Sequence, residues 1–133
     1  MSAGGSIDVR SGMPPGAENG SARPVPVDLG HLRRFTMGDI ALEKEILSLF
    51  ADQLPVTIAA LKSAPSVKEW GIAAHTLKGS ARAVGAWSLA DVAEAAEKLQ
   101  RFADHTERAL AVGRIEAAAG EAQDYIAALR HAA

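Results

Sequence analysis

The sequence of 133 residues contains no cysteine, which excludes disulfide bonds, thiolate zinc sites and cysteine nucleophiles. No apolar run approaches the roughly 18 residues that a membrane-spanning helix needs, and the N-terminus lacks the pattern of a signal peptide. Aromatic residues make up only 5% of the chain, and the formal net charge of −2 gives no basic surface for nucleic acid. We therefore expect a cytoplasmic protein with neither a nucleic-acid partner nor a membrane segment.

Motifs for metals and nucleotides are also missing. His31, His105 and His131 share no helical turn with a second histidine or a carboxylate at ligand spacing, so no metal site is expected. No glycine-rich loop of the phosphate-binding kind is present. We expect a protein that binds no cofactor of its own and does not phosphorylate itself from ATP.

The periodicity of apolar residues is helical throughout, and no segment alternates with the period of a strand. The expected helices cover residues 28–35, 39–63, 66–85, 88–103 and 106–130. Four long amphipathic helices with short connections predict an all-α, antiparallel up-down four-helix bundle over residues 28–133, with the short first helix as a cap. Residues 1–27, rich in Gly, Ser and Pro, are predicted to be a disordered tail.

Local signals refine these helices. Capping residues are expected at Asp28, in Ser66-x-x-Glu69 and in Ser88-x-x-Asp91. Pro55 lies inside the second helix and predicts a kink or a local break, because proline removes a backbone donor. Gly85 is expected to end the third helix. The stripes predicted to face inward include Phe35, Leu42, Leu49 and Val67.

The third helix carries the candidate site. Its apolar stripe runs along one face, and His75 points almost directly away from that stripe. Gly71, Lys78, Gly79 and Arg82 lie at i−4, i+3, i+4 and i+7 from the histidine, so they surround it on the helix surface.

This arrangement favours a histidine that carries a phosphoryl group. An exposed imidazole is a nucleophile, and neighbouring cations stabilise an anionic group attached to it. Glycine in a helix interior costs about 0.5–1 kcal/mol relative to alanine, so glycines beside His75 indicate that another molecule must come close. The alternative to a phosphorylated histidine is a solvated surface histidine, which does not account for the glycines and cations together.

These residues also resemble a known family. The pattern is His75-x-x-Lys78-Gly79-Ser80, then Val84-Gly85-Ala86, with Gly38-Asp39-x-x-Leu42-x-x-Glu45 upstream, Leu61 and Trp70 at core positions and Glu97 on the next helix. It resembles the histidine-containing phosphotransfer (HPt) domain of multistep two-component signalling. The resemblance covers roughly residues 28–129.

The resemblance implies a function and roles for single residues. The domain would relay a phosphoryl group between receiver-domain aspartates through Nε2 of His75, while the receiver supplies Mg²⁺. Lys78 would pair with phosphoryl oxygens, and Gly79 would let the receiver loops approach. Arg82 is equally well a solvated helix arginine, and Glu97 is a supporting residue or a surface charge. The partners would be response-regulator receiver domains and a hybrid histidine kinase, and the protein would be a monomer.

We expect a partner to dock on an apolar surface near His75. The candidate residues for this surface are Ile72, Met37 and Ile40, each of which could instead be a core residue. Two other functions remain open. The bundle could be the phosphorylation domain of a chemotaxis-type or hybrid histidine kinase, or it could be an adaptor that binds a receiver without carrying phosphate.

Overall fold

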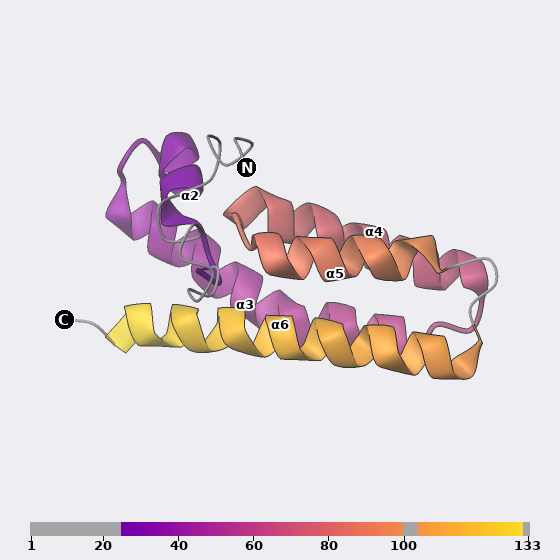
Figure 1. The fold of residues 1–133 in the computed structure, drawn as a ribbon. Helices are drawn as coiled ribbons and strands as arrows, with labels where there is room; N and C mark the ends of the chain where they lie inside the picture. The colour runs from indigo at the N-terminus through magenta and orange to yellow at the C-terminus, as the bar shows by residue number, and fades with distance from the viewer. Residues whose placement is uncertain (1–24, 100–103, 132–133) are drawn as a thin grey trace, which may run out of the picture.

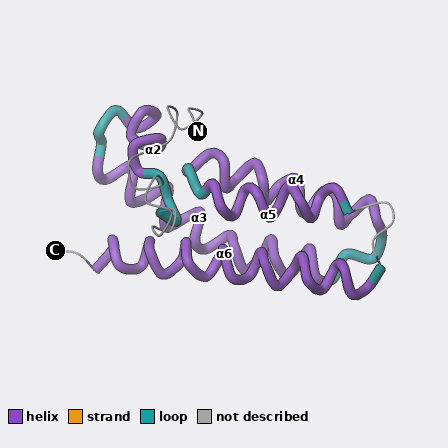
Figure 2. Tube along the Cα trace, in the orientation of Figure 1, coloured by secondary structure: helices purple, strands orange, loops and turns teal. Residues whose placement is uncertain are grey.

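The computed structural model describes residues 25–99 and 104–131, which form five helices. These are α2 (Leu29–Thr36), α3 (Ile40–Lys62), α4 (Val67–Val84), α5 (Trp87–Lys98) and α6 (His105–His131). This described part of the chain contains no strand (Figure 2), so the all-α prediction is confirmed. The expectations for residues 1–24 and 100–103, which include most of the predicted tail and the end of the fourth helix, lie outside the described residues.

The four long helices form a closed ring of neighbours. α4 packs against α3 and α5, and α6 packs against the same two helices. Figure 1 shows α3 running beside α6 and α4 beside α5, while α2 lies at one end of the bundle against α3 and α4. The predicted bundle with a capping helix is therefore confirmed. No helix in the described ranges is both long and apolar enough to cross a membrane.

The core combines a few large side chains with many alanines. Its largest fully buried members are Val27, Leu32, Leu54, Leu61, Leu77, Leu89, Ile115 and Ile126, and the larger Phe50 and Trp70 are almost completely buried. α5 presents Ala90, Ala93 and Ala96 to this core, and their small side chains let its backbone lie close to α4 and α6. Truncating a fully buried leucine such as Leu77 to alanine would cost about 2–5 kcal/mol, through lost transfer energy and the cavity left behind.

Several predicted core positions are wrong. Phe35, Leu42, Leu49 and Val67 are exposed, whereas Leu47 and Ala51 are buried. The buried residues of α3 follow the spacing Leu47, Ala51, Leu54, because this side of the helix turns toward the rest of the bundle. Leu42 and Leu49 lie on a different side of α3, which the bundle leaves uncovered. An apolar stripe wider than the packed face thus gives α3 exposed leucines.

Pro55 does not break α3, which is continuous from Ile40 to Lys62. Proline cannot donate a hydrogen bond to the carbonyl four residues earlier, which here belongs to Ala51. The Gln123 side chain reaches across from α6 instead, and its Nε2 donates to that carbonyl at 3.4 Å. The neighbouring helix therefore supplies a donor to the carbonyl that the proline leaves without one.

The caps of α4 match the prediction. Ser66 Oγ accepts from the Glu69 backbone N–H at 3.2 Å, and Gly85 ends the helix in the left-handed region with φ +83°. A Cβ atom on Gly85 would lie 2.8 Å from the Asp28 carbonyl oxygen, so this position requires glycine both for its conformation and for its space.

The starts of the last two helices differ from the prediction. α5 begins at Trp87 after Ala86, with no side-chain cap, so Ser88 is not its cap. Ala86 donates its N–H to Ala81 at 2.8 Å, and this bond at the end of α4 brings the chain directly into α5. α6 begins at His105, where Asp104 Oδ1 accepts from the Glu107 N–H at 2.8 Å. Residues 104–106 are therefore mostly helix cap and first turn rather than a connection.

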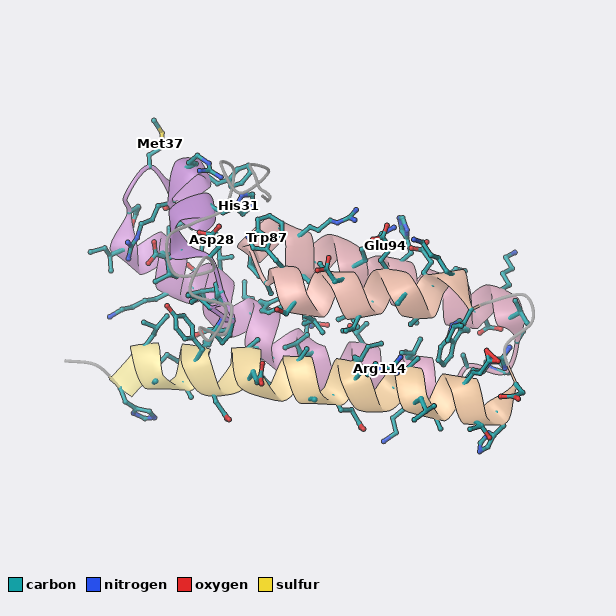
Figure 3. The ribbon with its side chains drawn as sticks, viewed as in Figure 1. Asp28, His31, Met37, Trp87, Glu94 and Arg114 are labelled. Carbon is teal, nitrogen blue, oxygen red and sulfur yellow. The ribbon has the colours of Figure 1, made fainter. Side chains whose placement is uncertain are left out.

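The segment before α2 is fixed to the bundle by Asp28. Its N–H donates to the Gly85 carbonyl at 2.9 Å, and its Oδ2 accepts from Trp87 Nε1 at 3.1 Å. Figure 3 shows Asp28, His31 and Trp87 gathered where α2 meets the start of α5. Val27, assigned to the tail from the sequence, is fully buried. The bundle therefore begins earlier than residue 28.

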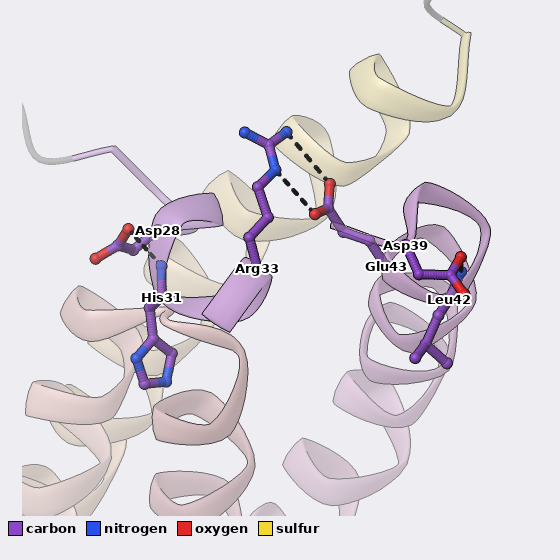
Figure 4. Close-up of polar contacts among 6 residues, drawn as sticks. All are labelled: Asp28, His31, Arg33, Asp39, Leu42 and Glu43. Atoms are coloured by element: carbon purple, nitrogen blue, oxygen red, sulfur yellow. Dashed lines mark hydrogen bonds and ion pairs between the residues drawn. The ribbon is translucent and has the colours of Figure 1, made fainter. Parts of the chain in front are cut away.

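An ion pair joins α2 to α3. Arg33 approaches the buried Glu43 with two nitrogens, at 3.0 Å from Nε to Oε2 and 3.4 Å from Nη2 to Oε1 (Figure 4). In the same view Asp28 caps α2 through the His31 N–H. Glu43 is buried whereas the Arg33 side chain is 55% exposed, so removing Arg33 would leave a buried carboxylate without its charged partner.

Candidate functional site

His75 lies in the middle of α4 and points out of the bundle. Its side chain is 68% exposed, whereas Ala74 and Leu77 on the same helix are almost completely buried. The apolar stripe of α4 packs inward and leaves the histidine on the opposite side. The predicted outward position of the imidazole is confirmed.

A carboxylate from α5 holds one side of the imidazole. Glu97 Oε2 lies 2.9 Å from His75 Nδ1, and Glu97 Oε1 lies 2.7 Å from Lys78 Nζ. α4 supplies the histidine and the lysine three residues apart on one face, and α5 packs beside α4 with Glu97 facing them. The three side chains form one chain of contacts, which we call the His75–Glu97–Lys78 triad.

The triad selects the tautomer of the histidine. An ionised carboxylate only accepts hydrogen bonds, so Nδ1 must carry the proton that it shares with Glu97. In a neutral imidazole the lone pair is then on Nε2. Among the residues that the structure describes, no group hydrogen-bonds to Nε2 of His75. The exposed nitrogen is therefore the nucleophilic one.

The charge on Glu97 is also favoured. The hydrogen bond from Lys78 is the main reason that the pKa of Glu97 is lowered, and the contact with His75 adds to it against the opposing effect of burial. A carboxylate that stays ionised can stabilise positive charge on the imidazole ring as Nε2 forms a new bond. Glu97 thus both orients the ring and supports its reactive form electrostatically.

Lys78 differs from the free surface cation that the sequence suggests. Its side chain is only 14% exposed, because α5 covers the flank of α4 on which it lies. Its closest charged contact is with Glu97, an oppositely charged residue on that neighbouring helix. The structure therefore places Lys78 as a partner of Glu97, whereas direct contact with a phosphoryl group stays a prediction.

The other two supporting residues are less closely tied to the imidazole. Arg82 is half-exposed and lies 3.6 Å from Glu94, an acidic residue that the sequence did not single out. Gly71 is buried, so the expectation that it leaves open space above His75 is wrong. Although Gly71 is only one helical turn before the exposed His75, its side of α4 is covered by the rest of the bundle.

Gly79 does leave open space. It is exposed, and a Cβ atom built on it would find no atom within 4 Å. No contact with the described part of the chain therefore requires glycine at this helical position, one turn beyond His75. A role of Gly79 in letting a partner approach stays a prediction.

The docking candidates are all exposed, but they lie in different places. Ile72, one turn before His75, is 55% exposed, and Ile40 and Met37 are 62% and 91% exposed. Met37 projects from the turn between α2 and α3 at the tip of the molecule (Figure 3), away from the middle of α4. Ile72 is the only one of these three next to the imidazole in the helix.

Ile72 also borders an apolar groove that the sequence did not reveal. The groove lies between the second half of α3 and the first half of α4, with a volume of about 460 Å³ and a lining that includes Val56, Ala60, Ile72 and Thr76. Val56 is exposed although it is apolar. Residues of both helices line the groove, so a pattern read along a single helix could not show it.

The described residues contain no group of three or more His, Cys, Asp or Glu side chains that could hold a metal ion.

Comparison with protein families gives a match between residues 45–132 and the family described as Hpt domain. No curated protein and no solved structure matches the chain. The family match covers most of the bundle, including α4, α5 and the His75–Glu97–Lys78 triad.

Proposed function

The chain belongs to the Hpt domain family, and we propose that it relays phosphoryl groups between receiver aspartates through His75. Members of this family have a phosphotransfer role in two-component signalling and interact with receiver domains and kinases. The observation that carries the proposal is the contact of Glu97 with Nδ1 at 2.9 Å, which leaves Nε2 exposed with its lone pair. The phosphoryl group would thus arrive from one receiver and leave to another.

The transfer step uses one nucleophile and one leaving group. Nε2 of His75 attacks the phosphorus of an aspartyl phosphate, so an N–P bond forms and the P–O bond to the receiver's carboxylate breaks. The electron pair of the broken bond leaves with that carboxylate. The ring keeps its Nδ1 proton, and Glu97 stabilises the positive charge that develops on it. The reverse step passes the phosphoryl group to the aspartate of a second receiver.

Catalytic help beyond the triad would come from the receiver. Mg²⁺ bound there would neutralise the charge of the phosphoryl oxygens, and the bundle would contribute a positioned nucleophile.

We assign Lys78 a positioning role through Glu97. Replacing either residue alone should then slow transfer by a similar factor, and Lys78→Ala combined with Glu97→Gln should cost little more than one change. Additive losses would instead indicate that Lys78 acts on the phosphoryl group independently.

The receiver would dock over Ile72 and Gly79, on either side of His75. Ile72 gives apolar contact at the edge of the groove between α3 and α4, and Gly79 gives close backbone approach. Met37 and Ile40, at the end of the molecule, would contact only a partner that extends that far along the bundle.

The test is transfer from a phosphorylated receiver domain to the purified protein. The product should be an acid-labile, base-stable phosphohistidine, and His75→Gln should abolish it while the helical circular dichroism is unchanged. Incubation with ATP alone should give no label. Labelling that survives His75→Gln would refute the assignment, and docking without labelling of the unmodified protein would indicate the adaptor function.

A further inference from the structure

A second pocket lies where the end of α3, the beginning of α4 and the first turns of α6 meet. Its volume is about 360 Å³, at the lower end of the range for small-molecule sites. Leu61, Trp70 and Val112 give it an apolar wall. Lys62, His105 and Arg108 line it with nitrogen-bearing side chains. None of these residues belongs to the His75–Glu97–Lys78 triad.

Arg108 is the unusual member of the pocket. Its guanidinium carbon lies 5.6 Å from the centre of the Trp70 ring, and its Nε atom is buried without a hydrogen-bond partner. Within the described ranges it forms no ion pair, whereas Lys62 is 3.1 Å from Glu116. Contact with an aromatic face offsets only part of the cost of removing an arginine from water. Among the described residues, the Arg108 guanidinium is therefore a positive charge in this pocket for which no anionic side chain is within ion-pair distance.

The wall behind Arg108 is fixed before any ligand arrives. Trp70 is 4% exposed, and its Nε1 donates to the Ala96 carbonyl of α5 at 2.8 Å. This hydrogen bond and the burial of the ring hold the indole in one orientation. A flat apolar group entering the pocket would thus meet a rigid surface and lose little energy in reorganising it.

We propose that this pocket binds a small organic anion with a flat apolar body and a single carboxylate. The carboxylate matches the one uncompensated guanidinium, which can donate two parallel hydrogen bonds to it. The apolar body matches Leu61, Trp70 and Val112, which an inorganic ion would leave unused. The site is separate from phosphotransfer and does not depend on the function proposed for His75.

The two tryptophans allow the proposal to be tested in the whole protein. The ¹⁵N-labelled chain is titrated with 2-naphthoate, and the indole N–H signals of Trp70 and Trp87 are followed by NMR. Trp87 is the first residue of α5, beyond the end of α4 that is far from Trp70, and it donates to Asp28, so it is an internal control. We expect a saturable shift of the Trp70 signal and none of the Trp87 signal. The neutral analogue 2-naphthalenemethanol should bind about tenfold more weakly or worse.

Substitutions separate the charge of Arg108 from general effects. Arg108→Met keeps an apolar stem over Trp70 and should weaken 2-naphthoate by about tenfold. Arg114→Met, which removes an exposed arginine of the same helix (Figure 3), should not change the affinity. The proposal is overturned if millimolar 2-naphthoate gives no saturable shift, if the neutral alcohol binds equally well, or if a folded Arg108→Met protein binds normally. The comparison of acid and alcohol in the unmodified chain remains decisive if that variant does not fold.

Discussion

Replacing Gly79 with glutamine separates the folding role of this position from its proposed docking role. Gly79 is in the interior of α4 and exposed, and a Cβ atom there would meet nothing within 4 Å. A longer side chain therefore adds helix propensity without a clash, and we expect about 0.5 kcal/mol of extra stability. For a domain of this size that gain raises Tm by about 2 °C.

A matched control exists on α6. Gly113 is also an exposed glycine in a helix interior, and a Cβ atom there would likewise meet nothing within 4 Å. Gly113→Gln should therefore give a similar rise in Tm, measured by circular dichroism. Since Gly113 is on α6, whereas the triad is formed by α4 and α5, its replacement should leave phosphotransfer unchanged.

The two variants should differ in their reaction with a phosphorylated receiver. The reacting atoms must approach within about 3–3.5 Å, and a glutamine one turn from His75 obstructs the receiver loops. We expect Gly79→Gln to accept phosphoryl groups about tenfold more slowly or worse, a rise in the barrier of about 1.4 kcal/mol. Phosphoramidate, which needs no protein surface, should label both variants at nearly the rate of the unmodified protein.

The reasoning about Gly79 fails in two ways that the assay distinguishes. Normal transfer by Gly79→Gln would show that the receiver does not use this space. A transfer defect accompanied by a lower Tm, or by an equal loss with phosphoramidate, would show that the substitution damages the helix or the imidazole itself.

Three further predictions concern the stability of the fold. Gly85→Ala should lower the free energy of unfolding by about 2 kcal/mol or more in urea, because it combines a left-handed φ with a 2.8 Å approach to the Asp28 oxygen; an unchanged midpoint would contradict this. The contacts that lower the pKa of Glu97 stabilise the fold above the ordinary pKa of 4.5, and this contribution is lost as the pH falls through the lowered folded-state pKa. Glu97→Gln should therefore make the stability fall less steeply as the pH is lowered below 4.5. Gln123→Leu should cost about 0.5–1.5 kcal/mol, and Pro55→Ala should rescue it by restoring the helix hydrogen bond; a loss unaffected by Pro55→Ala would refute the compensation.

Local signals in the sequence were sufficient for the helices themselves. Ser66 and Gly85 bound α4 as predicted, because capping depends on a few adjacent residues. The same kind of signal failed at Ser88. There the bond from the Ala86 N–H to Ala81 at the end of α4 fixes where α5 begins, and that constraint outweighs a favourable capping side chain. Helix starts determined by the preceding helix cannot be read from the following residues alone.

Packing between helices was the part that the sequence did not determine. A helical projection assigns Leu49 and Leu47 to positions 200° apart, yet both are apolar and only the neighbouring helices decide which is covered. The sequence did not indicate that Gln123 contacts the carbonyl of Ala51, because Gln123 and Ala51 are far apart in the chain. The apolar groove beside Ile72 likewise exists only once α3 and α4 are placed together.

In the candidate site, too, the features set by one helix were predicted, and the features set by packing between helices were not. The exposure of His75 and the open space at Gly79 follow from the geometry of one helix and were predicted from it. The burial of Lys78 and the position of Glu97 between two nitrogens depend on how α5 lies against α4. Only the resemblance to a family placed Glu97 near the histidine, and nothing in the sequence gave its contacts.

The pairing of the two cations also bears on how long a phosphohistidine would persist. Lys78 is already 2.7 Å from Glu97, and Arg82 is 3.6 Å from Glu94. A phosphoryl group on Nε2 of His75, as proposed above, would therefore find both cations already paired with carboxylates. Its negative charge would be offset only in part by these paired cations. The bundle itself would then stabilise such a phosphohistidine only weakly.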